Sequence, residues 1–299
     1  MKKFYVIFCL TLVIPALNLT AQKPITVYED SVLVGNYMHP GLSVTIPEVD
    51  YQKTLKNWIN QIETGTKSKV VSEDGLMTLF GARLKKISPN PVNMYSRLIN
   101  QDTLNKLMVC IELKKDQYLE PALGDAQMTT AKDYLKAFAK DQYIEFIKDE
   151  VAVEEKKLKE LNNEMNALEN TNSKSQRQAR SGRSTISDKQ ELLGLNSNEL
   201  AQVTADLNQQ RTDLIGMEAG PDKDTKAAQV KDLEKRKKKL QKESSNAEKK
   251  VKKAESSINQ ADRAIPLNES EQEAMRAKIT QQEAVVQKFK DKLNTVKLY

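Results

Sequence analysis

The chain has 299 residues, of which 29% are charged and 39% hydrophobic, and its formal net charge is +6. The excess of positive charge is small for a chain with so many charged residues. This balance is typical of solvated helix faces and does not favour a dedicated polyanion-binding protein. A single histidine excludes multi-histidine metal sites, and the sequence contains no CxxC pair, G-x-x-x-x-G-K-[ST] loop or G-x-S-x-G elbow.

A signal peptide is expected at residues 1–21. Lys2 and Lys3 precede an apolar run, and Ala21 offers the small residue that a cleavage site needs. The apolar run is too short for a membrane span. We therefore expect an exported protein, periplasmic, extracellular or at the cell surface, with no transmembrane segment after cleavage. The mature chain would keep one cysteine, Cys110, whose apolar neighbours favour a small buried side chain over a nucleophile.

Residues 22–128 are predicted to form an α+β head domain. Short apolar runs between turn residues indicate strands. Apolar residues from Leu55 to Ile62 share one helical face, and Asp50 suits an N-cap, so a helix is expected to begin at Tyr51. The expected arrangement is an antiparallel sheet with one helix across it. Strands are predicted at 25–34, 42–46, 69–72, 76–87, 92–99 and 104–113.

Catalytic constellations are not found in the sequence. His39 precedes Pro40 and Gly41, which predict a turn, and an exposed or locally bonded histidine is favoured there over a catalytic base. Paired carboxylates such as Asp149-Glu150 occur where a charged helix would carry them, and helix neighbours in sequence do not face each other. We therefore expect no enzyme and no cofactor. The alternative is an enzyme with a head site that lacks a recognisable motif.

Residues 129–299 are predicted to form a coiled-coil helical domain. Apolar residues recur at steps of three and four residues, which places them on one stripe that a partner helix must cover. Breaks are expected at 171–185, which lacks large apolar residues, at 218–222 and at Pro266, although a kinked continuation through Pro266 is left open. The resulting segments are about 130–170, 186–218, 225–265 and 268–297.

The two parts together predict the fold class. Short connections favour antiparallel neighbours, so we expect an α+β head followed by an all-α part. The head is a small antiparallel sheet with one helix, and the rest forms long antiparallel coiled-coil hairpins or an elongated helical bundle. Tyr134, Leu135 and Phe138 lie off the later apolar stripe and are expected to dock on the head sheet.

A basic run in the third helical segment is the one candidate contact site. Its members suit an anionic surface, whereas Lys237 falls on the apolar stripe. No aromatic residues are interleaved to stack on bases, so nucleic acid is not an expected partner. The candidate residues are Lys235, Arg236, Lys238, Lys239 and Lys242.

These observations favour a non-enzymatic secreted or periplasmic protein. It is expected to bind or space other envelope proteins, or to self-associate, through its helices. One alternative is a periplasmic holdase-type chaperone. Another is an envelope-surface binding module that uses the basic third helix.

Overall fold

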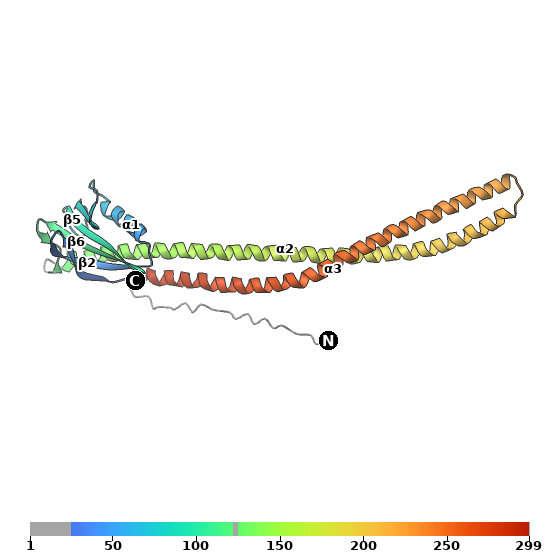
Figure 1. Cartoon of the computed structure of the whole chain (residues 1–299). Helices are drawn as coiled ribbons and strands as arrows, with labels where there is room; N and C mark the ends of the chain where they lie inside the picture. Colours follow the sequence, from blue (N-terminus) through green and yellow to red (C-terminus); the bar gives the residue numbers. More distant parts are fainter. Residues whose placement is uncertain (1–24, 122–124, 299) are drawn as a thin grey trace, which may run out of the picture. The chain divides into compact units, whose positions relative to one another are not determined.

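The structure, a computed structural model, describes residues 25–121 and 125–298. The predicted signal peptide lies outside these residues. The chain forms an antiparallel sheet with one short helix, followed by two long helices (Figure 1). An α+β part followed by an all-α part is therefore the observed architecture, as the sequence predicted.

The described residues fall into two compact units. Unit 1 holds the sheet, the short helix, the chain up to Val153 and the end of the last helix from Val286. Unit 2 is Glu154–Val285 and consists of the remaining parts of the two long helices.

The sheet of unit 1 combines the β1–β2 hairpin with an antiparallel run from β3 to β6. Its strand order is β1-β2-β6-β5-β4-β3, and β7 also pairs with β6. The sheet is antiparallel with one helix, α1 (Tyr51–Glu63), as predicted, but it is not a simple meander, because β2 pairs with β6 and not with β3. The strands are β1 (Val27–Val34), β2 (Tyr37–Pro47), β3 (Val71–Glu73), β4 (Leu76–Ala82), β5 (Val92–Gln101), β6 (Leu104–Lys114) and β7 (Gln117–Tyr118).

The predicted turn around His39 is wrong. Pro40 and Gly41 lie inside β2 and pair with β1, while the chain reverses at Gly35, which has φ +60°. Glycine is needed at position 41 because a Cβ there would lie 2.7 Å from the Val109 carbonyl oxygen and 2.9 Å from Val32 Cγ2. The glycine thus permits close strand packing and does not mark a turn.

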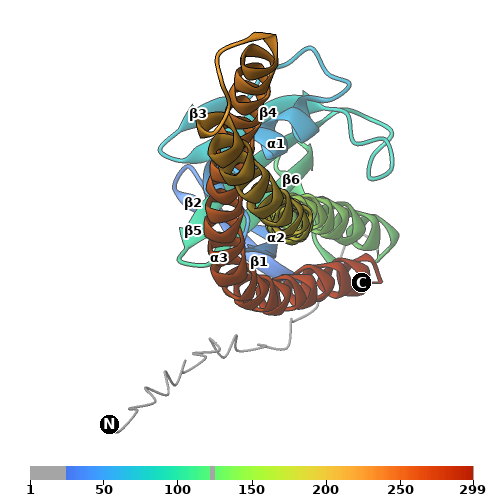
Figure 2. The ribbon, with the colours of Figure 1, turned by 90° about the vertical axis from the view of Figure 1, so that its right-hand side faces the viewer.

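Helix α1 begins where the sequence predicted. The Asp50 side chain accepts a hydrogen bond from the Lys53 backbone N–H at 2.8 Å, which is the expected N-cap. Its apolar face, with Trp58 and Ile62 fully buried, contacts the sheet core. Figures 1 and 2 show α1 beside the strands.

The first turns of α2 (Asp125–Ile215) dock on the same core. Leu135 and Phe138 are buried in this core and Tyr134 packs against it, as expected from the sequence. The Trp58 ring lies between these elements, with its centroid 5.0 Å from that of Phe138 and its Nε1 donating to Ser96 Oγ at 2.9 Å. One tryptophan therefore connects α1, β5 and α2.

The end of α3 (Pro221–Lys297) also belongs to unit 1. Val296 is fully buried in the same core. Lys292 Nζ donates to Glu48 Oε2 at 2.7 Å and lies 5.3 Å from the centroid of the Tyr143 ring. Glu48 follows β2 and has φ +61°, and its backbone N–H donates to the Thr103 carbonyl at 2.9 Å.

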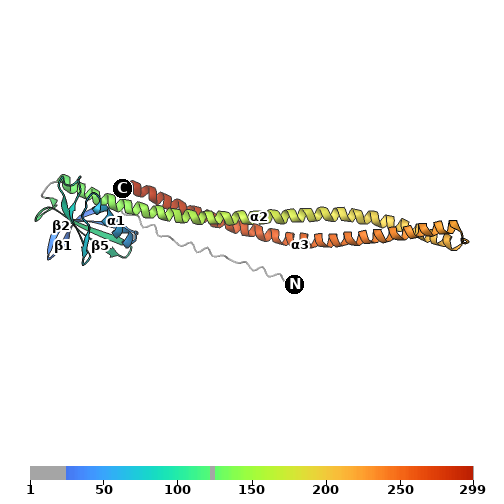
Figure 3. The ribbon, with the colours of Figure 1, turned by 90° about the horizontal axis from the view of Figure 1, so that it is seen from above.

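Unit 2 is an antiparallel pair of helices, drawn side by side in Figures 1 and 3. The reversal predicted at 218–222 is present, because α2 ends at Ile215 and α3 begins at Pro221. Proline is well suited to a first helical position, where its missing N–H costs nothing. Among the described residues, no helix contains a stretch long and apolar enough to cross a membrane.

The break predicted at 171–185 is wrong, because α2 runs through it without interruption. This stretch contains no proline, and its inward positions are occupied by small or polar residues such as Ala179 and Gly182. A Cβ on Gly182 would lie 2.7 Å from Ile258 Cγ1 of α3. The lack of large apolar residues therefore reflects close helix approach and does not mark a chain reversal.

Helix α3 likewise continues through Pro266, the alternative left open from the sequence. Pro266 is exposed, while Ile265 and Asn268 beside it face inward. A proline removes one backbone hydrogen bond. Asn268 lies within α3, where it is buried and its Oδ1 accepts from Gln272 Nε2 at 2.7 Å.

Candidate functional site

The predicted basic residues all lie on α3 in unit 2. Lys235, Lys238, Lys239 and Lys242 are exposed, as a contact surface requires. Arg236 differs, because its guanidinium forms an ion pair with Glu199 of α2 at 2.6 Å. That arginine is engaged in joining the two helices and is a weaker candidate for an external partner.

Unit 1 contains an open hollow of about 580 Å³ between the β2–α1 loop, the β5–β6 turn and α2. Sequence reasoning did not identify it, because its residues come from three distant segments. Apolar side chains such as Phe146 and Leu104 form part of its wall. The carboxylates that line it are Glu48, Asp50, Asp102, Asp149 and Glu150.

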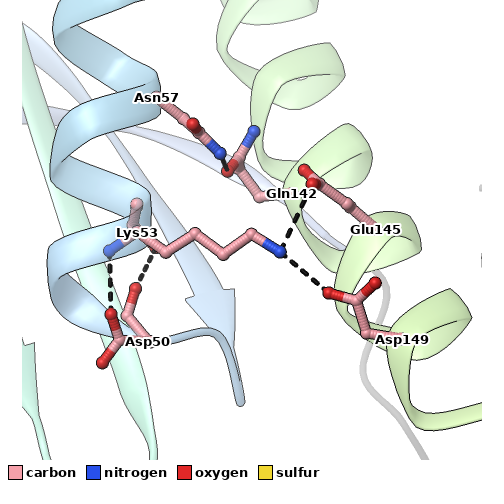
Figure 4. A network of polar contacts seen from close by, with 7 residues as sticks. Asp50, Lys53, Asn57, Gln142, Glu145 and Asp149 are labelled. Atoms are coloured by element: carbon pink, nitrogen blue, oxygen red, sulfur yellow. Dashed lines mark hydrogen bonds and ion pairs between the residues drawn. The ribbon is translucent and has the colours of Figure 1, made fainter. Parts of the chain in front are cut away.

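A lysine joins α1 to α2 at this hollow (Figure 4). Lys53 Nζ lies 2.9 Å from Asp149 Oδ2 and 3.3 Å from Glu145 Oε1. The hydrogen bond to Asp149, together with Glu145, raises the pKa of the Lys53 ammonium. One helical turn away, Asn57 Nδ2 donates to Gln142 Oε1 at 2.6 Å. These contacts fix the angle between α1 and α2.

Most charges at the hollow therefore already have partners within the fold. Asp50 caps α1, Asp149 binds Lys53, and Glu48 accepts from Lys292. In the part of the chain that the structure describes, no three His, Cys, Asp or Glu side chains come together in a way that could hold a metal ion. The arrangement joins helices of unit 1 to each other and to the end of β2.

A second polar cluster lies on the sheet face turned away from α1. Ser96 bonds to Trp58 of α1, so its neighbour Tyr95 points to the opposite face. There Glu112 Oε2 accepts from Asn93 Nδ2 at 2.8 Å and from the Tyr95 hydroxyl at 3.1 Å. Glu112 Oε1 accepts from the Asp116 backbone N–H at 3.1 Å. Only the strand register, which pairs Asn93 with Glu112, reveals this cluster.

The electrostatics of this cluster favour a fixed carboxylate. Burial acts to raise the pKa of Glu112, but the hydrogen bonds from Asn93, Asp116 and Tyr95 outweigh it and hold that pKa below its ordinary value. Burial, followed by the neighbouring Glu112 carboxylate, raises the pKa of Tyr95 to about 12. Tyr95 thus stays protonated and donates to an ionised partner.

Replacing Glu112 with glutamine is expected to destabilise unit 1 by about 1–2 kcal/mol at pH 7, because charge-assisted hydrogen bonds are lost. The folded pKa is depressed, so the carboxylate stabilises the fold above its ordinary pKa of 4.5 and ceases to do so as the pH falls through the folded value. Denaturant titrations at several pH values should show the difference between variant and wild type shrinking in acid.

The matched control is Glu73→Gln on the exposed strand β3, which should have little effect at either pH. A Glu112→Gln penalty that stays the same between pH 7 and pH 3 would contradict the assignment.

Cys110 and His39 lie near this cluster. Cys110 is fully buried, as expected, and burial raises the pKa of its thiol to about 12, which makes it a poor nucleophile. The His39 ring is half-buried, and its centroid lies 4.0 Å from that of Tyr118. His39 is therefore not the exposed or locally bonded turn histidine that was predicted, because it lies in β2 beside a ring of β7.

The chain was also compared with known proteins. No protein-family model matches it, and no curated protein does either.

Proposed function

We propose that this chain is a non-enzymatic, exported protein of a cell envelope that binds or spaces other proteins through unit 2. We further propose that unit 2 is a two-stranded antiparallel coiled coil. The observation that carries the proposal is the uninterrupted spacing of inward-facing residues along both helices of unit 2.

The inward-facing positions recur at alternating steps of three and four residues. In α2 they continue from Glu154 to Leu214, and in α3 from Lys223 to Gln282. We call these two rows of buried and half-buried positions the seam. Such spacing is what a heptad repeat produces when one helix covers the stripe of another.

Contacts between the helices keep one register. Asn196 Nδ2 donates to Ser244 Oγ at 3.3 Å, and Gly182 lies against Ile258. In both pairs the residue numbers have the same sum, 440, as an antiparallel pair without a slip requires. The ion pair between Arg183 and Asp262, at 3.0 Å, flanks the same layers.

The seam leaves most of each helix surface exposed. At about 1.5 Å per residue, the 154–215 part of α2 extends for about 90 Å. Much shorter helices would be enough to bury a small core. The long outer surfaces of these helices therefore suit contacts with other proteins or a spacing role. Paired helices also resist bending better than a single helix.

Site-specific photocrosslinking in the producing cells tests this role. A photoreactive residue at Leu195 of α2 or Asn246 of α3, both exposed, should give discrete adducts with envelope proteins. Ala247, buried in the seam beside Asn246, is the matched control and should give none. An absence of adducts at every exposed position of unit 2, or recovery of the protein outside the envelope fractions, would contradict the proposal.

A holdase-type chaperone is the second candidate, and one observation favours it. Large apolar side chains are exposed on β1 and at the start of β2, two on each face of the sheet. Exposed apolar patches often mark surfaces that bind other proteins. The residues are Tyr28, Leu33, Tyr37 and Met38.

Suppression of client aggregation distinguishes this candidate. A holdase would prevent aggregation of unfolded envelope proteins at stoichiometric amounts, and the double variant Tyr37→Ser, Met38→Ser would lose that effect. Phe80→Ser, at an exposed position on β4, serves as the control. No suppression by the wild-type chain removes the candidate.

A further inference from the structure

The outward side of α3 in unit 2 carries an unusual run of lysines. Between residues 235 and 253, nine helix positions lie furthest from the seam, and all but Ser245 and Asn246 are lysine. All of these lysines are exposed. We call them the lysine face: Lys235, Lys238, Lys239, Lys242, Lys249, Lys252 and Lys253.

The lysine face is narrow and straight. Its positions fall within an arc of about 100° around the helix axis, centred opposite the seam, because one residue advances the helix by about 100°. Its length is about 27 Å at about 1.5 Å per residue. All of its ammonium groups can therefore approach one plane at the same time.

Few of these positive charges have a carboxylate partner in the part of the chain that the structure describes. Among the described residues, the face makes one ion pair, from Lys239 Nζ to Glu243 at 3.9 Å, and its other six lysines have none. Arg236 is excluded from the face because it binds Glu199, and Lys237 because it lies on the seam. The sequence-based choice of residues thus changes once the seam is known.

The opposite side of the same helix pair differs in charge. Residues 187–205 of α2 lie across from residues 235–253 of α3. Within 187–205, the positions that lie furthest from the seam include Asp188 and Glu191 and no basic residue. This part of unit 2 therefore has one strongly positive side and one weakly negative side. On a negatively charged surface, this difference would orient the helix pair with α3 towards that surface.

We propose that the lysine face adsorbs to an anionic lipid bilayer. Lysine ammonium groups act as point charges without the fork geometry of arginine, which suits fluid and unspecific anionic head groups. The stretch 235–253 contains no aromatic residue to stack on bases or sugars. Its outward positions also contain no large apolar residue, so adsorption occurs without insertion. This inference concerns a lipid partner and does not depend on the protein partners proposed above.

Vesicle co-sedimentation tests the proposal, using the chain from Gln22, which keeps every described residue. Vesicles of phosphatidylcholine with about 30 mol% phosphatidylglycerol should bind the chain in about 50 mM salt. Binding should fall by at least about tenfold in about 300 mM salt, because the interaction is a screened surface attraction. Vesicles of phosphatidylcholine alone should not bind.

Two variants of equal charge change identify the surface. Lys235→Glu, Lys239→Glu, Lys242→Glu and Lys249→Glu together should reduce binding by more than about tenfold. The control replaces four exposed lysines outside the face in the same way and should change binding by less than about threefold. These control positions are Lys156, Lys159, Lys174 and Lys278. Circular dichroism should show the wild-type helix content in both variants.

Three results would overturn the proposal. Equal loss of binding in the two variants would show that only net charge matters. Binding to neutral vesicles would indicate apolar insertion. Tighter binding to a DNA 20-mer than to the anionic vesicles, at matched phosphate concentration and salt, would assign the lysine face to nucleic acid.

Discussion

Replacing Trp58 with alanine is expected to lower the free energy of unfolding of unit 1 by about 4 kcal/mol. The side chain is fully buried and contacts the rings of Phe138 and Tyr134, so its removal leaves a large cavity between α1, β5 and α2. It also leaves the buried Ser96 hydroxyl without its donor. The Trp58→Ala substitution is expected to have a far smaller effect on the stability of unit 2. Unit 2 contains no aromatic residue.

Because unit 2 lacks aromatic residues, the unfolding of the two units can be followed by separate spectroscopic signals. Near-ultraviolet circular dichroism of the tyrosines reports on unit 1, while ellipticity at 222 nm reports mainly on the long helices. Trp58→Phe is the control, since it keeps a ring and loses the N–H donor, and should cost about half as much. Equal destabilisation by the alanine and phenylalanine variants would show that ring packing is not what holds these elements together.

The two glycines of α2 in unit 2 should respond oppositely to a leucine substitution. Gly194 is exposed, and a Cβ added there would have no atom within 4 Å apart from its own stretch of helix, so Gly194→Leu should stabilise unit 2 by about 0.5–1 kcal/mol through helix propensity. Gly182 lies against Ile258, so Gly182→Leu should destabilise unit 2 by about 1–3 kcal/mol through overpacking. Thermal and denaturant unfolding at 222 nm measures both.

A compensating change separates overpacking from other causes. Ile258→Ala should relieve the contact and recover part of the stability lost in Gly182→Leu, which gives a coupling between the two positions. Stabilisation by Gly182→Leu similar to that of Gly194→Leu would mean that the two helices do not approach closely at this point.

The sequence predicted unit 1 well because its signals are local. Apolar alternation indicates the strands, and Asp50 with the Trp58 face indicates the helix, so the order of elements follows. The turn prediction at Pro40-Gly41 was wrong because the reason for the glycine is a contact with Val109 and Val32 from other strands. No local pattern contains that information.

In the helical part, the break predicted at 171–185 was wrong because local composition was given too much weight. The apolar stripe before residue 171 and the one after 185 are in phase: Leu168 and Ile186 are joined by inward positions at 172, 175, 179 and 182. A true break would have no reason to keep that phase. The preserved phase was the available signal for one continuous helix, and it also holds across Pro266.

The candidate sites were predicted only in part. The basic run was visible in the sequence, but assigning Arg236 to the helix pair and adding Lys249, Lys252 and Lys253 to the lysine face required the seam. The Glu112 cluster depends on strand register and on which sheet face is free. Both are tertiary properties that composition and spacing leave open.

Disulfide trapping between α2 and α3 tests the central claim, that these helices pair with each other in one register within a single chain. Asn196 and Ser244 face each other, with side-chain atoms 3.3 Å apart. In a chain that lacks other cysteines, Asn196→Cys with Ser244→Cys should oxidise to a crosslinked monomer. The out-of-register pair Asn196→Cys with Val251→Cys should not. A disulfide-linked dimer, or equal crosslinking of both pairs, would contradict the account.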